Sequence, residues 1–234
     1  MNFLDSGAQS ASENMCLDQK LLEQLRPDGT PCLHFYSWSE PSLTYGYFLK
    51  PEEHLHVHQA ARYGLQWARR PTGGGCVFHL WDLAFSFLLP SQHPSFSLNS
   101  LENYRFVNNI VFHALRSFFS LEALQFHPTA SAIAHPHRNF CMALPTQYDV
   151  IYQGKKIAGA AQRKRHNGYL HQATLSLAFP ERALLKELLL NEKTADEMCE
   201  TTFAPLGEQC PPSRLETTRH DLKHHLQMQF SASL

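Results

Sequence analysis

The sequence has no excess of one charge, no long apolar run and no pairing pattern among its cysteines. Its formal net charge is −1 at pH 7, so no strong field would gather nucleic acid or anionic lipid, and neither partner is expected. The longest apolar stretch, around residues 83–89, is far shorter than the roughly 20 residues that cross a membrane. Residues 1–14 lack the basic and apolar regions of a secretion signal.

The six cysteines contain no C-x-x-C pair, and a chain of this size does not need disulfides to be stable. Reduced thiols are therefore expected, as in a soluble cytoplasmic protein. With 43% hydrophobic and 18% charged residues, the chain can bury a sizeable core and is not disordered.

Periodic apolar residues predict several helices. Residues 101–119 carry an apolar face at helical spacing, formed by Tyr104, Val107, Ile110, Val111, Ala114, Leu115 and Phe118. A shorter segment at 14–25 shows similar spacing. Residues 182–190 and 221–230 are also predicted to be helical, with a proline-rich link at 205–212.

Other segments have the pattern of strands. Residues 174–179 alternate strictly, with Leu175, Leu177 and Phe179 on one face. Further strands are predicted at 33–38, 42–48, 65–70 and 148–153. Together these elements predict an α+β fold, in which a mixed, mostly antiparallel sheet packs against helices.

A glycine-rich segment at 69–79 is the first candidate for chemistry. It reads Arg-Arg-Pro-Thr-Gly-Gly-Gly-Cys-Val-Phe-His. Consecutive glycines cost backbone entropy and bury nothing, but they let a backbone approach a ligand and present N–H groups to it. The two arginines add charge-assisted donors. A tight turn with two solvated arginines is the alternative, and the segment matches neither a P-loop nor a dinucleotide fingerprint.

A lysine among small residues is the second candidate. Residues 154–163 read Gly-Lys-Lys-Ile-Ala-Gly-Ala-Ala-Gln-Arg. Lys155 is expected to be a solvated charge. Lys156, beside Ile157 and Gly159, is better explained as a lysine that passes through a tight space toward a ligand.

The third candidate is Cys141, in the segment 141–149. A lone cysteine is usually a small buried apolar residue. On a loop just before a lysine-bearing turn, it could instead be a thiolate nucleophile whose pKa is lowered by nearby cations.

Taken in order, three motifs resemble the lipoate-protein ligase and octanoyltransferase family. They are the glycine-rich segment at 69–79, the Gly-Lys-Lys-Ile-Ala-Gly-x-Ala-Gln segment at 154–162, and Leu-His-Gln-Ala-Thr-Leu at 170–175. Residues 12–18 and 35–38 are similar too. The resemblance covers roughly residues 5–180, most of the chain.

The resemblance implies a biotin/lipoate ligase type of catalytic domain with an acyl pocket. Residues 1–180 would form the acyl-binding catalytic core, and residues 181–234 a helical C-terminal extension of the same domain. Cys141 and Lys156 would be catalytic, with Lys156 contacting the acyl carbonyl or an acyl-phosphate oxygen. The implied substrate-binding residues are Arg70, Thr72, Gly73, Gly74, Gly75, His79, Gly159, Ala160 and His171.

Two reactions compete within this family. An octanoyltransferase takes octanoyl from an acyl carrier protein onto a cysteine and needs no cofactor. A lipoate ligase uses ATP and magnesium to make an acyl-adenylate. Both then modify a lysine in lipoyl domains of 2-oxoacid dehydrogenase or glycine-cleavage proteins.

The segment 141–149 resembles the nucleophile loop of the cysteine-dependent transferases, and the roughly fifty residues after Pro180 leave little room for the accessory domain that ligases often carry. A thioester exchange is nearly isoenergetic and needs no ATP. The transferase is therefore favoured. Some positions depart from the family and leave the choice open: Gly75 replaces an arginine of transferases, Leu80 an aspartate of ligases, and His34 an arginine.

Two interpretations from other classes are also considered. On a strand, His54, His56 and His58 would share one face with spacing suitable for zinc. They follow an acidic proline-led segment and precede a helical pattern, so a solvated segment explains them better and no metal is expected. A non-catalytic acyl-binding or lipoate-binding module is the other alternative, and it requires Cys141 to be inert.

Overall fold

A large twisted sheet forms the centre of the protein. The computed structural model describes residues 1–128 and 146–234. The sheet has seven strands in the order β1-β2-β6-β10-β9-β8-β7. They are β1 (Asn2–Gln9), β2 (Cys32–Trp38), β6 (Asp82–Pro90), β10 (Gly168–Ser176), β9 (Lys155–Arg165), β8 (Val150–Tyr152) and β7 (Leu124–Phe126).

Antiparallel pairing dominates this sheet. Among the described strands of this sheet, only β1 and β2 pair in parallel. The pairs β2–β6, β6–β10, β10–β9, β9–β8 and β8–β7 are antiparallel. The predicted α+β fold with a mostly antiparallel sheet is therefore confirmed.

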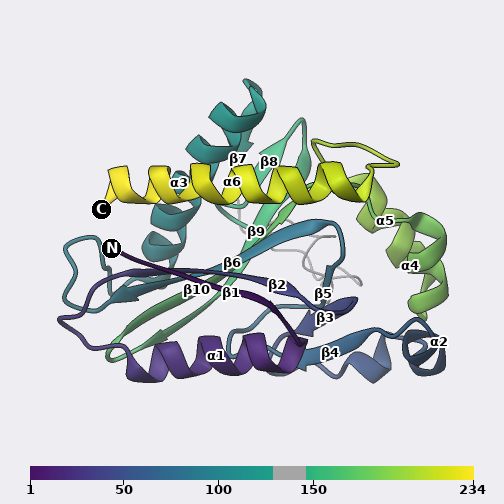
Figure 1. Ribbon diagram of the computed structural model, residues 1–234, viewed down its shortest axis with the longest axis horizontal. Helices are drawn as coiled ribbons and strands as arrows, with labels where there is room; N and C mark the ends of the chain where they lie inside the picture. The colour runs from purple at the N-terminus through teal and green to yellow at the C-terminus, as the bar shows by residue number, and fades with distance from the viewer. Residues whose placement is uncertain (129–145) are drawn as a thin grey trace.

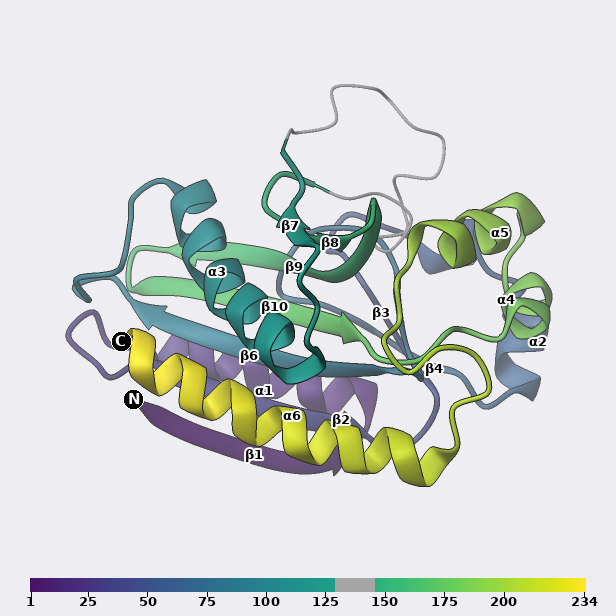
Figure 2. The ribbon, with the colours of Figure 1, turned by 90° about the horizontal axis from the view of Figure 1, so that it is seen from above.

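Helices cover both faces of the sheet. On one face lie α3 (Ser100–Phe119) and α6 (Pro212–Ser233), and on the other lies α1 (Ala11–Gln24), as Figures 1 and 2 show. Phenylalanines of β2 and β6 point toward α3 and α6 and form the main core with Phe230. The alternation of the strands sends the intervening residues toward α1.

A smaller sheet lies beside the first. It has three strands, in the order β4-β3-β5. They are β3 (Ser42–Tyr45), β4 (Gln66–Arg69) and β5 (Val77–His79). The small sheet shares a second core with α4 (Arg182–Leu188) and α5 (Glu192–Thr201), and η1 (Pro51–Glu53) and α2 (Val57–Arg62) lie in the connection from β3 to β4.

The structure confirms the strongest helix predictions and corrects others. The helix predicted at 101–119 is α3, and that predicted at 221–230 is the inner part of the longer α6. Residues 174–176 end β10, but residues 177–179 lie outside it. The β1 strand and the α5 helix were not predicted. The β1 strand carries no clear apolar period. The buried side chains of α5 recur at helical spacing, but they are mostly small: Thr194, Ala195, Met198 and Cys199.

None of the helices in the described ranges is both long enough and apolar enough to cross a membrane. The histidines at 54, 56 and 58 do not share the face of a strand, because they lie at the end of η1 and the start of α2. Within the described ranges, no group of three or more His, Cys, Asp or Glu side chains could hold a metal ion.

The packing of α6 generates a test of stability. Leu222 is fully buried against the main core, whereas Met228 on the same helix is 61% exposed. Leu222→Ala is expected to lower the free energy of unfolding by about 2–5 kcal/mol, because it leaves a cavity. Met228→Ala, the control, is expected to change it by no more than about 0.5 kcal/mol. Equal denaturation midpoints for the two variants would show that α6 is not part of the core.

Candidate active site

A narrow cavity lies where the small sheet meets the large one. Its walls come from β3, β5 and the end of β4 on one side and from β9 and β10 on the other, with α1 and β2 at its floor. The lining residues are Met15, Tyr36, Thr44, Arg70, Val77, His79, Lys156, Gly159, Ala160, Ala161, Gln172, Ala173 and Thr174.

The cavity measures about 30 Å³. This is the space of one water molecule, far less than an eight-carbon chain occupies. The lining side chains therefore enclose little free space. Met15, with its unbranched side chain, is the most adaptable of them.

A buried ion pair lies at one end of the cavity. The Lys156 Nζ is 2.7 Å from Asp149 Oδ2, and the side chains are 4% and 0% exposed. The other carboxylate oxygen accepts a hydrogen bond from the Tyr104 hydroxyl, and the backbone N–H of Thr146 donates to Oδ2 at 2.6 Å. A buried ammonium is tolerated only with such a partner. This partnership fixes where the charge of Lys156 lies.

The β8–β9 hairpin positions Lys156. Its turn places Gln153 and Gly154 at positive φ, the conformation that tight hairpin turns require. The next residues return along β9, where Lys156 lies over Gly159. A Cβ at Gly159 would overlap Cε and Nζ of the lysine. The tight space predicted around Lys156 is therefore present.

A second polar group lies on the opposite wall. The Asp82 carboxylate is 2.7 Å from His79 Nδ1 and accepts a hydrogen bond from Thr174 Oγ1 at 2.5 Å. The other ring nitrogen of His79 is 2.8 Å from Thr44 Oγ1, to which the Arg70 guanidinium donates at 2.8 Å. These bonds form one continuous chain from a carboxylate to a guanidinium along the cavity.

Electrostatics fix the roles within these groups. Burial pushes the pKa of Asp82 upward, but its contacts with His79, Thr174 and Arg219 together hold that pKa below its ordinary value. Burial and the Asp149 charge raise the pKa of Tyr104 well above its usual value, so Tyr104 stays a hydrogen-bond donor.

The glycine-rich turn folds around the Arg70 side chain. Arg70 donates to the carbonyl oxygens of Gly73 at 3.0 Å and Gly75 at 2.7 Å. A Cβ at Gly46 would overlap the carbonyl of Gly74, so the two backbones touch. The interpretation of Arg69 and Arg70 as two solvated arginines is wrong for Arg70, which is buried. Among the described residues, Arg70 lines the cavity, but the glycines at 73–75 do not.

Thr72 connects this turn to the large sheet. Its hydroxyl donates to Gln172 Oε1 at 2.6 Å, and Gln172 Nε2 donates to Asp18 of α1 at 2.6 Å. Asp18 also contacts His34 Nδ1 at 2.9 Å and accepts from Ser86. The floor of the cavity is thus a closed polar network, and His34 belongs to it as a partner of Asp18.

His171 lies one layer away from the cavity, fully buried between Tyr104 and Tyr169. Burial lowers the pKa of His171 to about 3, so its ring is neutral at pH 7. Its role in substrate binding remains a prediction.

The structure brings Arg70, Thr72, His79, Lys156, Gly159 and Ala160 together around one cavity or its immediate support. Cys141 lies outside the described residues. Sequence reasoning assigned no role to Asp149 or Tyr104, or to Thr44, Asp82 and Gln172. A buried lysine implies a carboxylate nearby, and this signal could have indicated Asp149, at the end of the segment that begins with Cys141.

Sequence comparison now identifies the family. Residues 10–227 match the lipoyl protein ligase A/B catalytic domain. The chain belongs to this family. Octanoyltransferase LipM of Anoxybacillus flavithermus is 32% identical over 185 residues, which cover 76% of this chain and 66% of that relative. LipM of Bacillus subtilis is 28% identical over 209 residues, covering 86% and 74%. The matches to these two relatives span about two thirds to three quarters of their length.

Solved structures of the family share the fold. A lipoate-protein ligase A bound with ATP superimposes with a TM-score of 0.76 at 23% identity, covering 99% of this chain and 84% of that chain. The bi-partite lipoate protein ligase of Thermoplasma acidophilum gives 0.71 at 24% identity, covering 99% and 82%. The predicted lipoate-ligase type of catalytic-domain fold is thereby confirmed.

The buried imidazole of His171 predicts that the stability of this protein depends on pH. The folded-state pKa of His171, about 3, lies below the unfolded value of about 6.5. The unfolded chain therefore binds the extra proton, and stability is present above pH 6.5 and lost as the pH falls toward 3. From pH 7 to pH 5, the wild type is expected to lose about 2 kcal/mol more than His171→Gln in denaturant unfolding. Parallel losses would contradict a neutral buried ring.

Proposed function

We propose that this protein transfers an octanoyl or lipoyl group to a lysine of a lipoyl domain through a thioester on Cys141. The observation that carries the proposal is the buried Lys156–Asp149 pair at the end of the narrow cavity. The relatives named octanoyltransferase LipM support it by sequence. The donor is an acyl carrier protein, the acceptors are lipoyl domains of 2-oxoacid dehydrogenase or glycine-cleavage proteins, and the route uses no cofactor.

In the first step, the Cys141 thiolate attacks the carbonyl carbon of the donor thioester. The carbon–sulfur bond to the carrier breaks, and the carrier sulfur leaves as a thiolate. Negative charge develops on the carbonyl oxygen, and a fixed ammonium stabilises it more in the transition state than in the ground state. Lys156 is the group proposed for this task, because Asp149 and Gly159 restrict its position.

In the second step, the amine of the acceptor lysine attacks the acyl-enzyme carbonyl. The amide forms, the Cys141 thiolate leaves, and the amine releases a proton. His79 is proposed to hold the substrate from the opposite wall, oriented by Asp82. A thioester is more reactive than the amide product, so this step needs no ATP.

Support for Cys141 comes from its neighbours along the chain. Thr146 follows Cys141 closely in the chain, and its N–H and hydroxyl both donate to Asp149, the partner of Lys156. Arg70 and Thr72 are proposed to bind the substrate at their side of the cavity. The glycines at 73–75 are proposed to shape the turn around Arg70. Gly159 and Ala160 are proposed to line the acyl chain's path.

The covalent step predicts a mass change. After mixing with octanoyl-carrier protein without ATP, the intact mass should rise by one octanoyl group. Cys141→Ala should show no gain. Lys156→Ala should slow the gain on the order of a hundredfold, because it removes one oxyanion partner. Lys155→Ala, the exposed neighbour, should react like the wild type.

Two other outcomes would count against the proposal. Modification of a lipoyl domain only when lipoate, ATP and magnesium are supplied would make the protein a ligase. No modification under either condition, with tight binding of lipoate, would make it a binding module.

The close contact of Lys156 with Gly159 gives a second test. Gly159→Ala places a methyl group where the lysine terminus lies, so Lys156 has to move away from Asp149. Misplacing a positioned group costs on the order of a hundredfold in rate. Single-turnover transfer should therefore fall nearly as far in Gly159→Ala as in Lys156→Ala. A rate equal to that of the wild type would mean that the observed lysine position does not matter.

A further inference from the structure

An exposed aromatic pair lies on the outer side of the glycine-rich turn. The Phe48 side chain is 93% exposed and Tyr47 is 48% exposed. Within the described ranges, no other exposed large apolar side chain is more accessible than Phe48. Aromatic side chains are enriched at protein–protein interfaces, and contiguous exposed apolar side chains often mark such sites.

The pair is held in place before any partner binds. The guanidinium carbon of Arg69 lies 4.6 Å from the centre of the Tyr47 ring, and the Tyr47 and Phe48 rings meet edge to face at 5.2 Å. The Tyr47 N–H donates to the Thr72 carbonyl at 3.2 Å. We call Tyr47, Phe48 and Arg69 the aromatic patch. Pre-ordered Tyr, Phe and Arg side chains lose little entropy on association.

The aromatic patch is linked to the cavity lining through the backbone of the glycine-rich turn. Gly46, which precedes it, touches the backbone of Gly74. Arg69, within the patch, is followed by Arg70, whose side chain lines the cavity. The glycine-rich turn therefore carries the cavity on its inner side and the patch on its outer side.

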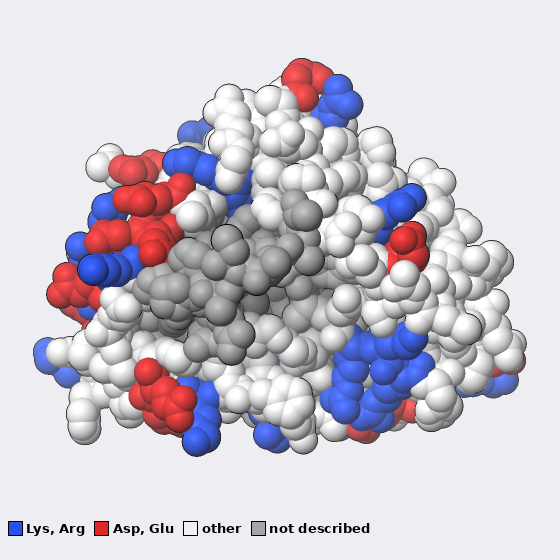
Figure 3. All heavy atoms as spheres, turned by 180° about the vertical axis from the view of Figure 1, so that it is seen from behind, with Lys and Arg blue, Asp and Glu red and all other residues white. Residues whose placement is uncertain are grey.

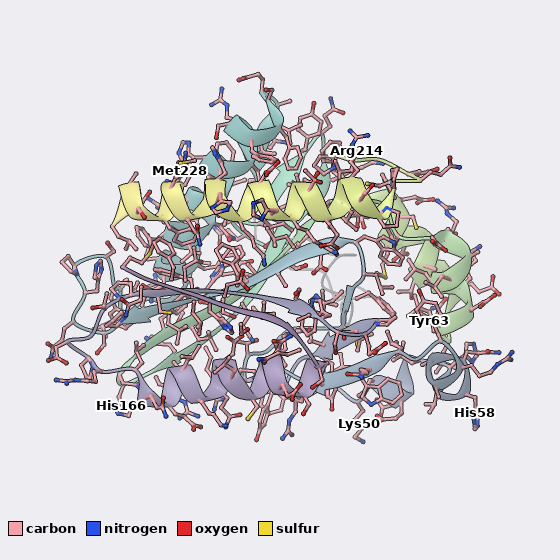
Figure 4. The ribbon with its side chains drawn as sticks, viewed as in Figure 1. Lys50, His58, Tyr63, His166, Arg214 and Met228 are labelled. Atoms are coloured by element: carbon pink, nitrogen blue, oxygen red, sulfur yellow. The ribbon has the colours of Figure 1, made fainter. Side chains whose placement is uncertain are left out.

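A cation of the large sheet lies close to the patch. Arg163 of β9 donates at 2.8 Å to the carbonyl of Pro71, which follows Arg69 and Arg70 in the chain. A further cluster of Lys and Arg lies at the lower right in Figure 3, on the side of the molecule where His166 is labelled in Figure 4. Arg163, Lys164 and Arg165 precede His166 in the sequence. Such a surface favours an acidic partner.

We propose that the aromatic patch docks the folded acceptor domain, an acidic domain that presents the target lysine at an exposed turn. This inference rests on the proposed function for the identity of the acceptor. A lysine extends from its backbone by only a four-carbon stem, so the acceptor domain itself has to touch the rim of the cavity. A carrier delivers its acyl group on a long prosthetic arm and does not need the same contact.

Direct binding tests the docking surface without requiring catalysis. An unmodified lipoyl domain of a 2-oxoacid dehydrogenase, isotopically labelled, is titrated with the full chain and its amide shifts are followed by NMR. Phe48→Ala and Arg69→Glu should each weaken binding by about tenfold or more, as truncation of a central anchor does. Met228→Ala removes an exposed apolar side chain from α6, labelled in Figure 4 away from the patch, and should bind like the wild type.

Separate measurement of the two chemical steps identifies which partner uses the patch. Phe48→Ala should form the acyl-enzyme from octanoyl-carrier protein at the wild-type rate and should also acylate a short lysine peptide normally. Its kcat/KM for the folded lipoyl domain should fall about tenfold. Equal binding of the domain by Phe48→Ala and Met228→Ala would overturn the inference, as would an equal loss in the carrier step. A wild type that binds the domain through the patch but forms no acyl-enzyme would refute the covalent mechanism alone.

Discussion

A lysine ammonium removed from water has to be compensated, and much of the site follows from that constraint. Asp149 supplies the opposite charge. Its carboxylate also accepts hydrogen bonds from Tyr104 of α3 and from Thr146. Gly159 leaves the space that the lysine occupies. The pair therefore ties together a hairpin, a helix and the chain that follows the segment of Cys141. Removal of either charged partner would leave a buried charge unpaired, which is far more costly than breaking an exposed salt bridge.

The cavity lies where the two sheets meet, and polar networks connect the sheets there. Arg70 and Thr44 belong to the small sheet, and Thr174 and Gln172 to the large one. Each network ends in a buried carboxylate, Asp82 in one case and Asp18 in the other. Satisfied networks of this kind restrict geometry more than apolar contacts do, because every misaligned donor costs free energy. The same networks include residues that line the narrow cavity, Arg70, His79 and Thr174 among them.

Local sequence pattern predicted the elements whose packing is one-sided. The apolar face of residues 101–119 became α3, because one helix face covers the sheet and the other meets water. The strand at residues 155–165 was harder to predict from the sequence. It is long and consists mostly of small and basic residues. It has no alternation of apolar and polar residues, and Ile157 is its only β-branched side chain. The β1 strand is likewise polar and lies at the edge of the sheet, where only one neighbour provides hydrogen bonds.

The sequence by itself determined the family and the α+β class, and its ordered motifs of glycine, lysine and arginine made Arg70, His79 and Lys156 candidates for the site. Only the tertiary structure decided which groups these residues face. Asp149 lies close to Lys156 in sequence, but Tyr104 and Gln172 reach the site from distant segments. A hydrogen bond depends on distance in space and leaves no periodic trace along the chain. The fold therefore had to be known before the lysine, the two carboxylate networks and the aromatic patch could be placed around one glycine-rich turn.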